Sequence, residues 1–356
     1  TPDYPTIKSA IQALNAQGVP LGGITYLIRS GTYNEDSLRI RTSTSNSSAP
    51  IMFRPDTGAT VIVNVTPPST AYNFVFSVDT TRNVTISGIR LGGAATDRNM
   101  TINALGTNGQ VGVRVFGNSD NCTLNNLVIF CAGTLTSTSV RGVDIRYSSA
   151  TQIPDSSVVD YVYVKRAGVG IRVEGFNVTS PVTRTWIQNC SIATGAGDSV
   201  GATGISTTNT LNPVIRGNTV RNLYGTGTVS GIFIGTQCGA AQVINNSIAT
   251  LRTTGTGSNV NGITQNSTQD VGGLRYYNNM ISDINGVATG TGPIYGFYIS
   301  GGSNSVADTF YYNSVNLSGT GPGLRKSAAL GLEYFGGTQI VVVRNNVFVN
   351  TRQDGL

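Results

Sequence analysis

The sequence predicts an all-β fold, a parallel β-solenoid in which one chain winds repeatedly around a long core. Three observations predict it. A glycine-led strand motif recurs eight times at intervals of 27–35 residues, and a second motif centred on asparagine follows it in phase. Repeats of this length indicate a repeat architecture. The composition agrees, because only 11% of the residues are charged while the chain contains 45 glycines.

An amphipathic helix is expected at the N-terminus, over residues 6–17, and Gly18 can end it. A helix ahead of a solenoid is best interpreted as a cap that covers the first coil and blocks edge pairing. Residues 1–110 are therefore expected to form the cap helix and irregular opening coils, and residues 111–356 the regular coils of the same continuous domain. The apolar residues that share one face of the helix are Ile7, Ala10, Ile11 and Leu14.

The glycine motif marks the first strand of each regular coil. Each copy reads as a short strand, for example GVRVFG and GIFIGT, so the copies should lie side by side in one parallel sheet. The strands of Gly204 and Gly231, for example, should be neighbours. The eight glycines are Gly112, Gly142, Gly170, Gly204, Gly231, Gly262, Gly296 and Gly331.

The asparagine motif marks a turn between two later strands of each coil. Equivalent residues of stacked coils lie about 4.8 Å apart, and an asparagine amide both donates and accepts hydrogen bonds. The column should therefore form a structural ladder that lines an interior turn. Its members are Asn218, Asn246, Asn279, Asn313 and Asn346, with looser versions at Asn126 and Asn189.

Charged residues stack on one outward face when the glycine motifs are aligned. Arg114, Asp144 and Arg172 share one position, and two residues further on Arg146 is followed by Glu174. Alternating charges of this kind form a salt-bridged ladder, with roughly 0.2–1 kcal/mol per pair. The alternative is a polysaccharide site in which Asp144 and Glu174 act as paired catalytic carboxylates and the arginines bind the sugar.

Aromatic residues offer a second candidate surface, because outward tyrosines can stack on sugar rings. Phe233, Tyr298 and Tyr334 lie on or next to the charged face, and a purely structural aromatic ladder is the alternative. Trp186, the only tryptophan, is expected in the core or partly buried. The pairing of the cysteines stays open: Cys122 and Cys131 are close enough in sequence to form a bridge, and an inward-facing free thiol is an alternative for Cys190. The cysteines are Cys122, Cys131, Cys190 and Cys238.

Several kinds of chemistry are excluded or disfavoured by what the sequence lacks. The chain has no histidine, which removes Ser-His-Asp and Cys-His catalysis and histidine-ligated metals. There is no CxxC pair for a thiolate metal site, so neither a metal nor a cofactor is expected. The net charge of +6 is not concentrated in Lys/Arg runs, which argues against nucleic acid as a partner. No apolar run approaches the ~20 residues that span a bilayer.

The N-terminal stretches PTIKSAIQALNAQGVPLGGITYLIRSGTYNE, PIMFRPDTGATVIV and NVTISGIRL carry a resemblance that extends over essentially the whole chain. They are similar to right-handed parallel β-helix proteins of the pectin-lyase-like superfamily, and most similar to the secreted and cell-surface proteins of Bacteroidetes-type bacteria. The resemblance implies a right-handed coil and a secreted or surface location. It also implies O-glycosylation at Asp-Ser/Thr motifs, here at Ser37, Thr80 and Ser199. The missing histidine and aspartate clusters depart from the superfamily's hydrolases and lyases.

The C-terminal strand segment IVVVRNNVFVN has no visible cap, although it carries apolar residues such as Val343 and Phe348. Bare strand edges pair with other chains unless they are blocked. This end is therefore expected to be covered by further chain or by another subunit, with Thr1 to Pro5 as a docking strand. The alternative is that Thr351 to Leu356 fold back as a small cap.

The sequence favours a non-enzymatic function, that of an extracellular structural or adhesive module that forms or joins a surface assembly or filament. Two alternatives come from other classes. One is a lyase or hydrolase that acts on an acidic polysaccharide, and the other is a binder of such a polysaccharide without turnover. A groove that holds Asp144, Glu174 and the arginines would favour the enzyme.

Overall fold

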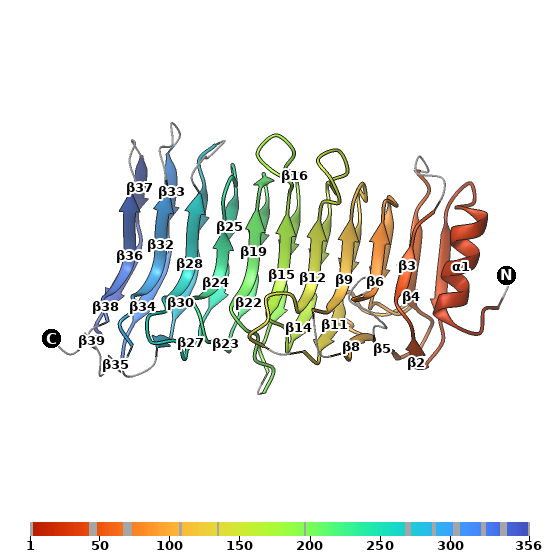
Figure 1. Ribbon diagram of the computed structural model, residues 1–356, viewed down its shortest axis with the longest axis horizontal. Helices are drawn as coiled ribbons and strands as arrows, with labels where there is room; N and C mark the ends of the chain where they lie inside the picture. The colour runs from red at the N-terminus through yellow and green to blue at the C-terminus, as the bar shows by residue number, and fades with distance from the viewer. Residues whose placement is uncertain are drawn as a thin grey trace.

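The protein is a single parallel β-helix with one α-helix at its N-terminal end, as the computed structural model shows (Figure 1). This confirms the fold class predicted from the sequence. Three long parallel sheets run along the molecule, and each coil contributes one strand to each of them, except the last described coil, which contributes β37 and β38 to two of the sheets. The structure describes residues 3–42, 48–66, 73–106, 109–133, 135–195, 197–267, 272–286, 290–301, 307–321, 325–334 and 340–354.

Sheet A has eleven strands. Its inward residues are apolar or aromatic, and Tyr276 and Phe310 stack inside the coil with ring centroids 4.6 Å apart. In spatial order the strands are β1 (Ile24–Ile28), β4 (Ile51–Pro55), β7 (Val84–Ser87), β10 (Thr123–Asn125), β13 (Val158–Asp160), β17 (Trp186–Gln188), β21 (Val214–Arg216), β25 (Gln242–Ile244), β29 (Arg275–Tyr277), β33 (Asp308–Tyr311) and β37 (Val341–Arg344).

Sheet B also has eleven strands, each of which follows the sheet A strand of the same coil. Several of its strands have only two residues, because the coil turns sharply on both sides of them. The strands are β2 (Gly31–Glu35), β5 (Val61–Val65), β8 (Met100–Ala104), β11 (Leu127–Cys131), β14 (Tyr163–Lys165), β18 (Ser191–Ile192), β22 (Thr219–Val220), β26 (Ser247–Ile248), β30 (Met280–Ser282), β34 (Ser314–Leu317) and β38 (Val347–Asn350).

Sheet C has ten strands and contains the glycine motifs. The strands are β3 (Leu38–Ile40), β6 (Phe74–Asp79), β9 (Val111–Phe116), β12 (Arg141–Arg146), β15 (Val169–Glu174), β19 (Thr203–Thr208), β24 (Val229–Ile234), β28 (Val260–Ser267), β32 (Ile294–Gly301) and β36 (Ser327–Tyr334). Short strands at the corners also pair in parallel: β16 (Val182–Thr183) with β20 (Thr210–Leu211), β23 (Leu223–Gly225) with β27 (Leu251–Thr253) and β31 (Ile284–Gly286), and β35 (Thr320–Gly321) with β39 (Gln353–Asp354).

The repeated glycine fills a position where a side chain has no room. A Cβ on Gly170 would lie 2.4 Å from the carbonyl oxygen of Gly204 in the next coil. The strands of Gly204 and Gly231 are neighbours, as predicted. The prediction is wrong for the eighth motif, because Gly331 pairs with Tyr298 and the equivalent position in β36 is Ala329. The sequence alignment of that copy was therefore displaced by two residues.

The asparagine column forms the buried ladder that the sequence predicts. Each side-chain amide donates to the amide oxygen of the next coil, from Asn218 to Asn246 at 3.0 Å and onward to Asn346 at 2.9 Å. Each also donates to a backbone carbonyl of an earlier coil, such as Asn246 Nδ2 to Ile215 O at 2.9 Å. The ladder therefore provides hydrogen-bond partners for both backbone and side-chain groups that are buried at the interior turn between sheets A and B.

In this turn, the residue with a left-handed backbone conformation is the one that directly precedes the ladder asparagine. Asn245 and Asn278 have φ values of 56° and 53°, a region that asparagine tolerates better than most residues. Asn126 and Asn189 also lie at this bend, with φ values of 56° and 53°. The prediction that they are early members of the ladder is therefore wrong. Cys190 occupies the ladder position in its coil, and its backbone N–H donates to Asn218 Oδ1 at 2.9 Å.

The helix α1 (Ile7–Gln17) covers the first coil, as predicted. Thr6 caps its N-terminus by accepting a hydrogen bond from Ser9 N at 3.0 Å, and Gly18 ends the helix with a φ of 77°. Asn15 then fixes the helix to sheet C, since its amide donates to Arg39 O at 2.8 Å. The four apolar residues of the predicted face are buried.

At the other end, the chain continues the coil instead of folding back over it. β39 pairs in parallel with β35, so the described part of the tail is not the small cap that the sequence analysis offered as an alternative. Val343 pairs with buried Phe310 yet is 44% exposed, and Phe348 is partly buried. Of the expected docking segment, Pro5 is exposed, and Thr1 lies outside the described residues. Self-association stays a prediction from the sequence.

All four cysteines are buried free thiols. The bridge between Cys122 and Cys131 that the sequence left open is therefore not formed. Cys122 Sγ contacts the backbone oxygen of Thr81 at 3.7 Å, and Cys131 Sγ that of Arg141 at 3.4 Å. Burial raises the pKa of three of these thiols, Cys122, Cys131 and Cys190, to about 12.

We expect these thiols to resist alkylation in the folded protein. A thiol that is protonated and out of reach of solvent reacts slowly, because the thiolate is the nucleophile. Iodoacetamide at pH 8 should leave the native chain unlabelled by intact mass, while the same treatment in denaturant should label every cysteine. Rapid labelling of the native chain, or a mass that shows a disulfide, would contradict this packing.

Candidate functional site

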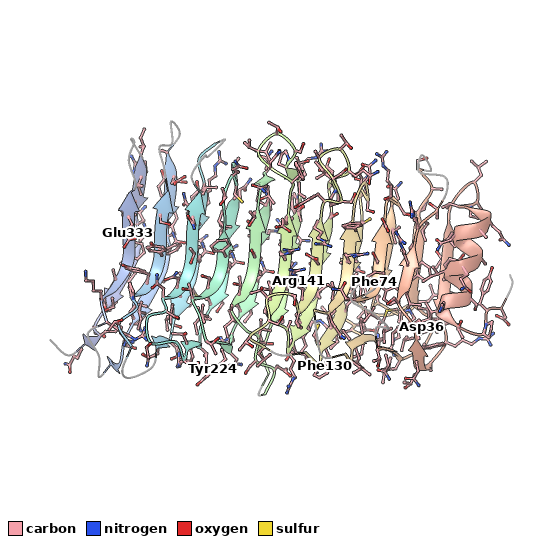
Figure 2. The ribbon with its side chains drawn as sticks, in the orientation of Figure 1. Asp36, Phe74, Phe130, Arg141, Tyr224 and Glu333 are labelled. Carbon is pink, nitrogen blue, oxygen red and sulfur yellow. The ribbon has the colours of Figure 1, made fainter. Side chains whose placement is uncertain are left out.

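The densest group of charged side chains lies on the outer face of sheet C, over β9, β12 and β15. The register places Asp144 beside Arg114 on one side and Arg172 on the other, and Arg146 beside Glu174. This is the stacking that the sequence predicts. Figure 2 labels Arg141 and Phe74 on this face, and two loops extend past the ends of β12 and β15 at its upper edge in Figure 1.

Asp144 is the centre of the group. It is only 1% exposed and receives charge-assisted hydrogen bonds from Arg172 Nε at 2.8 Å and Arg141 Nη1 at 3.2 Å. Arg146 Nε lies 3.6 Å from the same carboxylate. A carboxylate held in this way among three arginines is fixed in place and screened from solvent. It is poorly suited to proton donation or to nucleophilic attack.

Arg114 is held differently from the other arginines. Its guanidinium carbon lies 4.3 Å from the ring centroid of Phe74 and 4.5 Å from that of Phe116. Its Nε donates to Ser77 Oγ at 3.0 Å, and the residue is 8% exposed. Burial, followed by the charge of Arg146, lowers the pKa of Arg114 to about 10. The guanidinium is therefore in a position where an added negative charge would be favourable.

The remaining members complete a cluster with an excess of positive charge. Arg172 Nη1 contacts Glu174 at 2.9 Å, and Arg39 contacts Asp79. Among the described residues, the buried Nε groups of Arg141 and Arg146 have no hydrogen-bond acceptor. Burial also lowers the pKa of Arg141. Five arginines face three carboxylates in what we call the sheet C cluster: Arg39, Arg114, Arg141, Arg146 and Arg172 with Asp79, Asp144 and Glu174.

Other predicted site residues do not join this cluster. Tyr298 lies on the same outward column but four strands away from Arg172, roughly 19 Å along the sheet. Its hydroxyl donates to Glu333 Oε2 at 2.6 Å, and its ring stacks on Tyr295 with centroids 4.9 Å apart. Trp186 is 39% exposed on sheet A, with the Arg216 guanidinium 5.0 Å from its ring. It does not belong to the core.

The three glycosylation candidates lie at separate places on the surface. Ser37, Thr80 and Ser199 are each partly buried. Thr80 has a φ of 54°, and its hydroxyl donates to Asp79 Oδ1 at 3.1 Å. The modification of these residues stays a prediction.

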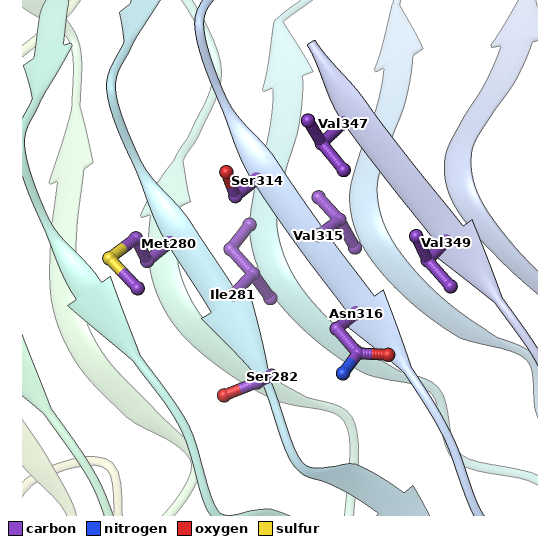
Figure 3. Close-up of a pocket in the computed structure, with 8 residues that line it drawn as sticks. All are labelled: Met280, Ile281, Ser282, Ser314, Val315, Asn316, Val347 and Val349. Atoms are coloured by element: carbon purple, nitrogen blue, oxygen red, sulfur yellow. The ribbon is translucent and has the colours of Figure 1, made fainter.

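Two cavities lie away from the sheet C cluster. One, of about 400 Å³, is a shallow apolar groove on the outer face of sheet B between β30, β34 and β38 (Figure 3). Met280 and Val347 line it and are 64% and 59% exposed. The other, of about 360 Å³, opens beneath α1, where Tyr26 stacks on Phe53 with centroids 4.7 Å apart.

The sequence predicted the charged residues at the centre of the cluster but not the aromatic and basic residues around them. Arg39 could have been found by extending the column of Arg114 backward through Ser77 to β3, and Phe116 by extending the column of Arg146 into β9. Phe74 lies in the column of Arg141. Arg141 precedes Gly142 directly, where the alternation of inward and outward residues is interrupted, so the strand pattern did not assign it to this face.

Among the described residues, no group of acidic, cysteine or histidine side chains could hold a metal ion. No helix in this part of the chain is long and apolar enough to cross a membrane.

No protein-family model matches this chain, and no curated protein matches it. Solved structures do match it. The alginate lyase from Paenibacillus sp. str. FPU-7 is 14% identical with a TM-score of 0.51, over 92% of this chain and 95% of that one. The DFA-IIIase from Arthrobacter chlorophenolicus A6 in complex with GF2 is 12% identical with a TM-score of 0.50, over 95% and 80%. PfbA, a surface adhesin of Streptococcus pneumoniae, is 11% identical with a TM-score of 0.47, over 94% and 86%.

The likenesses to the alginate lyase and the DFA-IIIase show the fold, and they confirm the parallel β-helix that the sequence predicts. Solved proteins with this fold include carbohydrate-active enzymes. The class that fold and site define together is a parallel β-helix protein with an arginine-rich, aromatic-lined face on sheet C.

Proposed function

We propose that this protein is a non-catalytic binder of acidic polysaccharides, and that the sheet C cluster is its binding face. One observation carries the proposal. Arg114 lies buried between two phenylalanine rings without a carboxylate in ion-pair contact among the described residues, within a cluster that has more arginines than carboxylates. A polymer with regularly spaced anions would supply the missing charge, and the open face of a sheet accommodates an extended chain.

The carboxylates support binding more than catalysis. Asp144 is enclosed by arginines, and Glu174 is held by Arg172. A glycosidase needs one carboxyl group that can give up a proton to the leaving sugar and a second that can attack or activate water. Neither side chain is free for these roles. The alginate lyase and the DFA-IIIase in complex with GF2 lend support from the fold alone, because their names show that carbohydrates bind to proteins of this shape.

A secreted or cell-surface location follows from this proposal, since acidic polysaccharides are components of cell surfaces and matrices. On such a surface the protein would act as an adhesive or structural module. Apolar residues of the C-terminal coil that are exposed, such as Val343, or partly buried, such as Phe348, are then candidates for contact with further chain or another subunit.

The double variant Arg114→Met, Arg146→Gln tests the proposal. Arg114 is in no ion pair with a described carboxylate, and Arg146 contributes only the longest of the three contacts to Asp144, at 3.6 Å, so both can be replaced with limited loss of stability. Binding to immobilised polygalacturonate at low salt should weaken about tenfold or more, because each charge-assisted hydrogen bond contributes about 1.5–3 kcal/mol. Added salt should weaken binding of the wild type as well. Neutral dextran should not bind to either protein.

Arg344→Gln is the matched control, since Arg344 is an exposed arginine at the far end of sheet A. It should bind like the wild type. Equal binding by the double variant and the wild type would overturn the sheet C assignment. Release of shorter chains or new reducing ends from any acidic polysaccharide would replace the proposal with the enzymatic alternative.

A further inference from the structure

A second group of cations lies on a different face, on the outer side of sheet B around β11 and β14. Figure 2 labels Phe130 near the lower edge of the molecule, away from Arg141. The Arg98 guanidinium lies 5.9 Å from the ring centroid of Tyr163, and Lys165 Nζ lies 5.7 Å from the same centroid. Arg166 lies 5.9 Å from the ring of Phe130. We call this group the sheet B patch: Arg98, Phe130, Tyr163, Lys165 and Arg166.

The cations of the sheet B patch have no ion-pair partner in the part of the chain that the structure describes. The carboxylate that reaches the patch, Asp198, accepts a hydrogen bond from the Tyr163 hydroxyl. Burial, followed by this hydrogen bond, raises the pKa of Tyr163, so the phenol stays neutral and adds no negative charge.

The aromatic rings hold these cations in position. A cation over a ring face is attracted by the negative charge of the ring's π system, and the ring restricts where the flexible side chain can go. Tyr163 is itself fixed by Gly195 N, which donates to its hydroxyl at 3.0 Å. Arg98 is fixed by its Nε, which donates to Tyr161 O at 2.8 Å. The positive charges are therefore arranged before any ligand arrives, which lowers the entropy cost of binding.

We propose that the sheet B patch is a second binding site for an anionic polysaccharide, with a carboxylate or sulfate group of the sugar held between Arg98, Lys165 and Arg166. Cations already lie near both rings, so the ligand binds through its anionic groups and not by stacking. A single face with three cations and no run of basic residues suits isolated, spaced anions better than the dense phosphates of a nucleic acid.

The position of the patch relates it to the sheet C cluster. β8, β11 and β14 belong to the same three coils as β9, β12 and β15. One long polysaccharide that contacts both faces would bind with an effective concentration set by the sugar between them. The inference extends the proposed function to a second face, but its evidence is separate, because it depends on different residues.

The test uses a triple variant of the sheet B patch that combines Arg98→Gln, Lys165→Gln and Arg166→Gln. It is compared with the wild type and with the double variant of the sheet C cluster, Arg114→Met with Arg146→Gln. Calorimetric titration with short oligogalacturonates should give a stoichiometry that halves in either variant. Binding of long polygalacturonate should weaken about tenfold or more in the triple variant. Repeating the titration with sulfated oligosaccharides shows which anion the patch prefers. Far-UV circular dichroism and thermal unfolding verify that each variant is folded.

Arg344→Gln is the matched control here as well, because Arg344 is an exposed arginine at the far end of sheet A, outside both proposed sites. It should bind nearly as well as the wild type. Unchanged stoichiometry and affinity in the triple variant would overturn the sheet B site while leaving the sheet C proposal intact. Loss of binding in the triple variant alone would keep the sheet B site and overturn the sheet C cluster. Equal or tighter binding of short duplex DNA at the patch would overturn the assignment to a polysaccharide.

Discussion

Replacing Asn246 by alanine should lower the free energy of unfolding by about 3–5 kcal/mol. Asn246 is 1% exposed and uses both ends of its amide. Its Nδ2 donates to Asn279 Oδ1 at 3.0 Å and to Ile215 O at 2.9 Å, and its Oδ1 accepts from the backbone and side chain of Asn218, each at 3.0 Å. Alanine removes all of these bonds and leaves buried groups without partners, where water cannot reach them.

The matched control is Asn64→Ala. Asn64 belongs to a short asparagine ladder on the outer face of sheet B, in which it donates to Asn34 Oδ1 at 3.0 Å and accepts from Asn103 Nδ2 at 2.8 Å. Water can replace these bonds, so the change should stay within about 0.5 kcal/mol. Urea unfolding followed by circular dichroism measures both, and hydrogen exchange shows whether β21, β25 and β29 are protected less. Equal effects of the two variants would mean that the buried ladder contributes no special stability.

Replacing Asp144 by asparagine should lower the free energy of unfolding by about 2 kcal/mol and leave polysaccharide binding intact or stronger. Removing one partner of a buried ion pair costs up to about 3–5 kcal/mol, and the cost is smaller here because the arginines reach solvent. Asparagine keeps the shape of the side chain but not its charge. The variant has no negative charge between Arg141, Arg146 and Arg172, so the attraction of these arginines to an anionic sugar increases.

Asp36→Asn is the control for this substitution, since Asp36 pairs with Lys8 on the surface, where its side chain is 63% exposed. It should change the free energy of unfolding by less than about 0.5 kcal/mol. Binding to polygalacturonate, measured beside the unfolding curves, separates the structural from the functional role. If Asp144→Asn abolished binding or any cleavage while its unfolding curve matched the wild type, Asp144 would be a functional carboxylate and not a structural one.

The periodic features of the fold could be predicted from the sequence because each is enforced once per coil. Gly170 and Gly204 recur because a Cβ in either place would meet the backbone of the next coil. Asparagine recurs at positions 279 and 313 because each side-chain amide forms a hydrogen bond with the amide of the neighbouring coil. Such constraints repeat at a fixed interval, and an interval is visible without a structure.

Features that occur once, or that depend on side-chain direction, could not be predicted in this way. The assembly of the sheet B patch depends on Arg98, which precedes Tyr163 by two coils and follows no repeat. The burial of Asp144 likewise depends on how far three arginine side chains bend over it, which the register alone does not determine.

The uniform direction of the asparagine ladder has a consequence for how this molecule can change over evolutionary time. Every amide from Asn218 to Asn313 donates to the coil that follows and accepts from the coil that precedes. Each coil therefore offers its successor the same set of groups that it received, and a duplicated coil would find compatible neighbours on both sides. In this half of the molecule, gene segments that encode whole coils can be gained or lost without disrupting the hydrogen bonds between neighbouring coils. Selection can therefore adjust the length of the molecule in steps of one coil.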